Sequence, residues 1–190
     1  TQKHDTMNEN LIRLLPLHVR PEGDEDPYFM TGEFFSYTSL PGCREWMRRW
    51  FKAAFSDEFI FTGVPGDLLY ATNQLRLLLY ALHLLQAKPI KKPNTVKEEN
   101  REPLQGAKSR GEVVFKFLSL NEITHPLSVV QEFFSFKDLE AWLQTLSLWE
   151  EAALSKTSIT ELQESDELLP IMEHLYKITE AAWVICVSAD

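Results

Sequence analysis

The stretch DLLYATNQLRLLLYALHLLQ, residues 67–86, decides the fold expected for this chain. It follows a turn-forming run at residues 63–66, and Asp67 suits the N-cap position of a helix. Between Asp67 and Gln86 its circumference is apolar apart from two tyrosine hydroxyl groups and the side chains of Thr72, Asn73, Gln74, Arg76 and His83. A helix that is apolar nearly all round is buried. The stretch therefore predicts a central helix that other helices surround.

Amphipathic helices are predicted on either side of this stretch, at residues 41–56, 135–155 and 165–184, with a short apolar one at residues 10–17. Pro41 stands in the first turn of its helix, and Ser135 to Asp138 resembles a capping box that opens another. In the 135–155 helix, a stripe is expected to pack against the last helix; it comprises Trp142, Leu143, Leu146 and Trp149. The fold class expected is mainly α, a bundle of about five helices.

Three short aromatic segments favour extended structure, at residues 33–38, 59–62 and 113–117. They allow a small N-terminal β-hairpin beside the helices. If all three pair into one sheet, the alternative is an α+β fold.

The region between the central helix and the later helices differs in composition from both. Residues 87–111 hold three prolines and two glycines among alternating charges, which is typical of a flexible linker. We expect one domain over residues 1–190, built from two packed halves, 1–86 and 112–190, that this linker joins. From Asp138 to Asp190 there are eleven acidic residues and only two basic ones.

Composition restricts the class of protein. Hydrophobic residues make up 44% of the 190, and the formal net charge is −9. That charge argues against a nucleic-acid partner, because phosphate binding depends on clustered lysine and arginine. Cys43 and Cys186 stand alone, as in a reducing compartment, and the most apolar run is too short to span a bilayer. A soluble cytoplasmic protein is expected, with no membrane association.

One polar strip runs along the central helix. Thr72, Arg76 and His83 project within about 40° of one another, and Arg76 and His83 lie about 10 Å apart along the axis. Glu173 and Glu180 share the same seven-residue spacing on the last helix and are the expected partners. The strip is interpreted first as a structural ladder of ion pairs. In the catalytic interpretation, His83 is a general acid or base and Arg76 stabilises an anion.

The spacing of Arg76 and His83 resembles the Arg-x(4–6)-His motif of HEPN-type ribonucleases. This resemblance covers the central helix alone, and leucine follows Arg76 where that family commonly has a polar residue. It implies a ribonuclease that uses these two side chains, without assigning the chain to the family.

Glutamate and histidine residues elsewhere in the chain are candidates for a buried acid and for metal ligands. Glu150 falls within the apolar stripe of its helix and is expected to emerge into solvent near Ser155; if it is covered, it must be protonated or paired. His83, His125 and His174 could supply a three-histidine metal site, but none of the usual paired-ligand spacings occurs. We therefore expect neither a metal nor a cofactor.

Two functional hypotheses result. The first is a helical interaction or regulatory module whose partner is another protein or a second copy of the chain. Its basis is the absence of a complete catalytic motif and the many aromatic side chains. The alternative is a HEPN-like ribonuclease or another hydrolase that uses Arg76 and His83.

Overall fold

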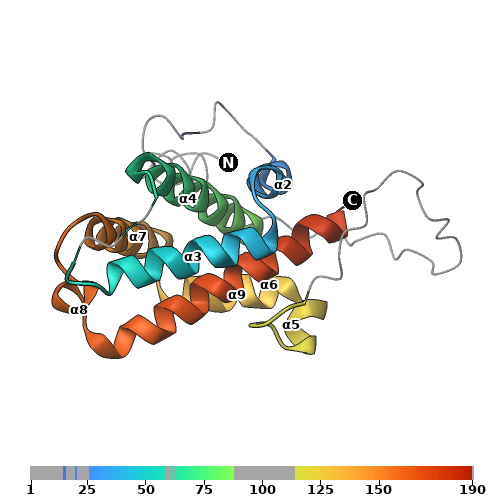
Figure 1. The fold of residues 1–190 in the computed structure, drawn as a ribbon. Coiled ribbons are helices and arrows are strands. Elements are labelled where there is room, and N and C mark those ends of the chain that lie inside the picture. The colour runs from blue at the N-terminus through green and yellow to red at the C-terminus, as the bar shows by residue number, and fades with distance from the viewer. Residues whose placement is uncertain are drawn as a thin grey trace, which may run out of the picture.

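The computed structural model describes Leu15, Arg20, Phe61 and residues 26–58, 63–87 and 114–189. Within these residues there are helices and no strands, which confirms the mainly α fold class. In chain order the eight helices are α2 (Pro27–Tyr37), α3 (Leu40–Ala54), α4 (Pro65–Ala87), α5 (Leu120–Thr124), α6 (Pro126–Phe136), α7 (Leu139–Leu154), α8 (Ile159–Leu162) and α9 (Ser165–Ala189) (Figure 1).

The expected N-terminal β-hairpin is absent from the described residues. Residues 33–37 belong to α2, and residues 114–117 have no regular structure. Helix α2 forms because the Asp26 side chain caps it by accepting a hydrogen bond from the Tyr28 amide, and Pro27 occupies its first turn. Met30, Thr31 and Phe34 then bury one helical face, and this packing outweighs the β preference of the aromatic residues. Of residues 59–62, only Phe61 is described.

Helix α4 is central, as predicted. Five of its leucines are fully buried, and α4 contacts α2, α6 and α7. The buried set comprises Leu68, Leu75, Leu78, Leu79 and Leu82. Because α4 has neighbours on several sides, its sequence needs apolar residues around most of its circumference.

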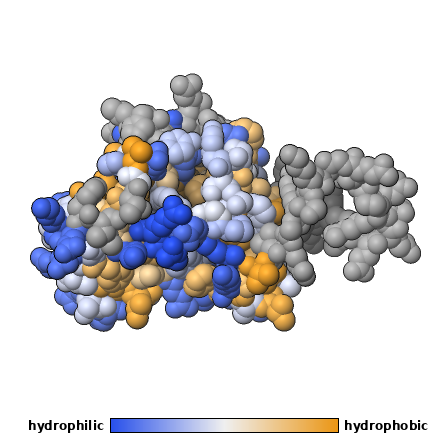
Figure 2. All heavy atoms as spheres, in the orientation of Figure 1, coloured by the Kyte–Doolittle hydropathy of each residue, from blue (hydrophilic) through white to orange (hydrophobic). Residues whose placement is uncertain are grey.

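Helix α3 lies beside α9 and also packs against α7 (Figure 1). One face of α3 is buried, including Cys43, Met47 and Phe51, and the Trp50 indole N–H donates a hydrogen bond to the Trp149 carbonyl oxygen at 3.1 Å. On the opposite side of α3, the Glu45 carboxylate forms salt bridges with the Nε atoms of Arg48 and Arg49, at 2.8 and 2.9 Å. Figure 2 shows a hydrophilic band there.

Helix α7 begins one turn later than the expected capping box. Asp138 is the N-cap and accepts a hydrogen bond from the Ala141 amide, whereas Ser135 lies near the end of α6. The predicted stripe of α7 is buried, but its main neighbours are α3 and α4 and not α9. The expected main contact between α7 and the last helix was therefore wrong.

Helix α6 was missed at the sequence level. Pro126 occupies its first turn, and Val129, Val130 and Phe133 form its buried face. It packs mainly against α9, which runs through Pro170 without interruption. Trp142 of α7 stacks on Phe133 with ring centroids 4.1 Å apart.

Helices from both sides of the predicted linker share one hydrophobic core. Leu15, which lies in the predicted helix at residues 10–17, is 1% exposed and belongs to this core. The rest of that predicted helix, and residues 88–111 of the predicted linker, lie outside the described residues. No helix in the described part of the chain has the length and apolar character needed to cross a bilayer.

Candidate functional site

Arg76 lies at the interface of α4 and α7, where its side chain is only 6% exposed. Its Nη1 donates to the Asn73 side-chain oxygen at 2.8 Å and to Glu150 Oε2 at 3.1 Å. A longer contact of 3.3 Å joins it to the Thr72 hydroxyl, and Nη2 donates to Ser147 Oγ at 3.2 Å. Both terminal nitrogens of the guanidinium group are thus engaged within the protein.

Glu150 is covered, and it supplies the carboxylate that neutralises Arg76. Its side chain is 17% exposed, and Oε2 also accepts a hydrogen bond from the Thr72 hydroxyl. The expectation that Glu150 emerges into solvent was wrong because α4 lies against this end of α7. An acidic residue inside the apolar stripe of α7 therefore faces a cation inside the apolar surface of α4.

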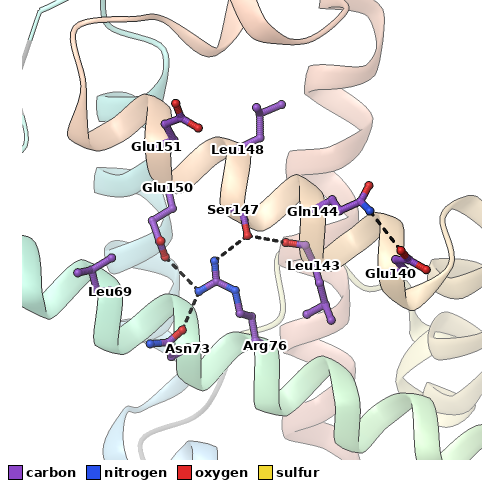
Figure 3. A pocket seen from close by; sticks show the side chains of 10 residues that line it. All are labelled: Leu69, Asn73, Arg76, Glu140, Leu143, Gln144, Ser147, Leu148, Glu150 and Glu151. Atoms are coloured by element: carbon purple, nitrogen blue, oxygen red, sulfur yellow. Dashed lines mark hydrogen bonds and ion pairs between the residues drawn. The ribbon is translucent and has the colours of Figure 1, made fainter. Parts of the chain in front are cut away.

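The register of α7 explains why these side chains meet. Leu143, Ser147 and Glu150 are separated by four and three residues, so they lie on one side of the helix. Ser147 Oγ donates to the Leu143 carbonyl oxygen at 3.0 Å, which leaves its lone pairs directed at Arg76. Figure 3 shows Arg76 reaching from α4 toward Ser147 and Glu150.

A cavity of about 590 Å³ lies above this cluster, between α4 and α7 (Figure 3). Its apolar lining comes from Leu69, Leu143 and Leu148. The polar lining consists of Asn73, Arg76, Glu140, Gln144, Ser147, Glu150 and Glu151. Because Arg76 is the only basic residue in this lining and is paired with Glu150, the lining carries a net negative charge.

The structure does not bring His83 into this cavity. The imidazole of His83 packs edge-on against Phe134 of α6, with ring centroids 5.0 Å apart, and its Nδ1 is buried without a hydrogen-bond partner. Burial lowers its pKa, and Asp138 opposes that effect. Arg76 and His83 thus share a helix, as predicted, but they face different neighbours.

Neither expected acidic partner meets Arg76. Glu173 of α9 is 63% exposed and lies 3.8 Å from Lys177. Glu180 is fully buried and pairs with Arg44 of α3. The expected partners of the polar strip were wrong because α7, rather than α9, covers this face of α4.

Glu180 forms a second buried polar cluster, which the sequence did not predict. Its carboxylate accepts hydrogen bonds from three consecutive backbone amides, those of Lys116, Phe117 and Leu118, at 3.0–3.2 Å. Arg44 also donates to the Val114 carbonyl oxygen at 2.9 Å. One signal was available, because Glu180 is the only charged residue in the stretch 178–189.

The three histidines considered for a metal site lie in different surroundings. His125 is exposed at the end of α5, His83 packs on Phe134, and His174 packs on Phe136 with ring centroids 4.5 Å apart. In the described part of the chain, no three histidine, cysteine, aspartate or glutamate side chains gather in a ligand-like group.

The chain was compared with protein-family models, with curated proteins and with solved structures, and none of the three comparisons gave a match.

Acidification is expected to destabilise the fold through His83 and His174. Burial lowers the pKa of both imidazoles in the folded chain. At His174, the positive charge of Lys177 lowers the pKa further, whereas Glu132 and Glu173 raise it. The unfolded chain then binds more protons, so stability should fall as the pH drops below about 6.5 and should level off below the folded pKa values. Urea midpoints measured across this range test the slope. A double variant, His83→Gln/His174→Gln, should show a flatter profile; an unchanged profile would contradict this assignment.

Proposed function

We propose that this chain is a helical protein-binding module and that the cavity between α4 and α7 is its binding surface. The observation that carries the proposal is the combination of leucine walls and an Arg76 side chain whose terminal nitrogens are occupied internally. A guanidinium group held in this way fixes two helices against each other and has little capacity left for a substrate anion. The leucine walls offer apolar surface to a partner.

The surroundings of His83 support the same proposal. A general acid or base must come within hydrogen-bond reach of the group that it serves. His83 instead packs on Phe134, and it is not among the residues that line the cavity.

The partner in this proposal is another protein or a second copy of the chain, and the location is the cytoplasm. A reducing compartment agrees with the isolated positions of Cys43 and Cys186 in the sequence, and the Cys43 thiol is buried. Burial raises the pKa of the Cys43 thiol to about 12, which makes it a poor nucleophile.

A displayed library of helical peptides, selected on the folded protein, tests this function. Leu69 is 41% exposed on the cavity wall. We expect the selected peptides to bind Leu69→Lys at least about tenfold more weakly, because a lysine placed there removes apolar contact and obstructs the surface. Isothermal titration with the purified variants gives the dissociation constants.

Leu169→Lys is the matched control. Leu169 is 73% exposed on α9 and does not line the cavity, so its replacement should leave binding unchanged. A library that yields no binder, or binders that bind Leu69→Lys as well as the parent protein, would contradict the proposed function.

A further inference from the structure

A row of α7 side chains forms one edge of the cavity between α4 and α7, so the cavity is bounded by two helices. Glu140, Gln144, Leu148 and Glu151 succeed one another on α7 at intervals of four, four and three residues, so they form one edge. This edge is about 16 Å long, or three helical turns. Leu69 and Asn73 of α4 stand opposite, as Figure 3 shows.

The charge of this groove is concentrated at the two ends of the α7 edge. Glu140 and Glu151 are both exposed, and no salt bridge within the described residues involves either one. Glu140 accepts a long hydrogen bond of 3.4 Å from the Gln144 amide. Glu150, by contrast, is engaged with Arg76. An occupant therefore meets a carboxylate at each end and leucine side chains between them.

We infer that the occupant is a basic amphipathic helix from another protein, and this inference rests on the proposed function. Its apolar stripe would contact Leu69, Leu143 and Leu148. Two arginine or lysine residues about eleven positions apart on the same face would reach Glu140 and Glu151, because eleven residues span the same rise on both helices. Helix-in-groove binding of this kind combines apolar anchors with charges at the rim.

A second copy of the chain fits this groove less well. Among the described helices, α3 is the one rich in arginine, but its apolar stripe is buried against α7 and α9. That stripe cannot enter the groove of another copy unless the fold opens. Because the arginine-rich α3 is unavailable, the negative charge of the groove favours a different protein as the partner.

Two synthetic helical peptides test the inference. Both carry the same leucine stripe; one has arginine at two positions eleven residues apart, and the other has glutamine at those positions. The arginine peptide is expected to bind the folded protein roughly tenfold more tightly at low salt, and the difference should shrink as salt is added. Titration calorimetry measures both affinities.

Removing the two carboxylates at the ends of the α7 edge provides the control. Glu140→Gln/Glu151→Gln should abolish the preference for arginine, while Glu161→Gln/Glu164→Gln, which changes two exposed carboxylates outside the groove, should preserve it. Equal binding of the two peptides would overturn the inference and leave the proposed function standing. Library-selected peptides that bind the groove without a pair of basic residues would have the same consequence. If the library also yields no groove binder, both fail. Self-association that Leu69→Lys abolishes would identify a second copy as the occupant and overturn the inference.

Discussion

Replacing Glu180 with glutamine is expected to lower the free energy of unfolding by about 4 kcal/mol, because it breaks a buried charge cluster. The Glu180 carboxylate is fully buried and accepts hydrogen bonds from Arg44 and from three consecutive backbone amides. Glutamine keeps the size of the side chain but exchanges one acceptor oxygen for a donor. Urea unfolding of the purified variant, followed by tryptophan fluorescence, measures the change.

The size of this effect follows from what the substitution leaves behind. The Arg44 side chain is 12% exposed and keeps its charge after its carboxylate partner is lost. At least one backbone amide of residues 116–118 also loses its acceptor. A buried donor without a partner costs roughly 1–3 kcal/mol, and an uncompensated buried charge costs more.

Glu173→Gln is the matched control on the same helix. Its carboxylate is 63% exposed and lies 3.8 Å from Lys177, so the substitution should change stability by less than about 0.5 kcal/mol. Similar losses for Glu173→Gln and Glu180→Gln would contradict the assignment of Glu180 as the buried anchor.

A double variant distinguishes the backbone amides from the ion pair. Arg44→Met/Glu180→Leu removes both charges, yet the amides of Lys116, Phe117 and Leu118 still lose their acceptor. We therefore expect it to remain destabilised. Full recovery of stability would show that the amides contribute little and that the salt bridge alone explains the loss.

The sequence predicted the helices whose apolar periodicity is long and regular. The ranges 41–56, 67–86, 135–155 and 165–184 correspond to α3, α4, α7 and α9, because each buries a stripe or, in α4, most of its surface. Helices α2 and α6 are short and rich in phenylalanine, which also favours strands. What decides their structure is the Asp26 cap of α2 and the first-turn Pro126 of α6, together with burial against α4 and α9.

The candidate site shows a different limit of sequence reasoning. The polar strip of α4 and the need of Arg76 for a carboxylate followed from residue chemistry alone. Which carboxylate meets Arg76 depends on which helix covers that face, and periodicity does not encode the neighbours of a helix. Glu150 and Glu180 both stand in apolar surroundings in the sequence, so each needed a partner, but only the packing pairs them with Arg76 and Arg44.

Replacing Arg76 with methionine is expected to cost about 3 kcal/mol of unfolding free energy. The substitution leaves Glu150 with the Thr72 hydroxyl as its remaining partner at the α4–α7 interface. The cost is smaller than at Glu180, because Glu150 is 17% exposed and water can reach it. Chemical denaturation under identical buffer conditions provides the comparison with the parent protein.

The double variant Arg76→Met/Glu150→Leu tests whether Arg76 and Glu150 form a structural ion pair or belong to a catalytic site. Removing both charges leaves no stranded carboxylate, and buried ion pairs replaced by apolar residues of similar size are often neutral or stabilising. We expect the pair to recover most of the stability that Arg76→Met loses, with a coupling energy of about 2 kcal/mol in the double-mutant cycle. If Arg76→Met instead unfolds at the same urea concentration as the parent protein, Arg76 does not hold α4 against α7. Its guanidinium group would then be available for a ligand, and the catalytic interpretation of this strip would replace the structural one.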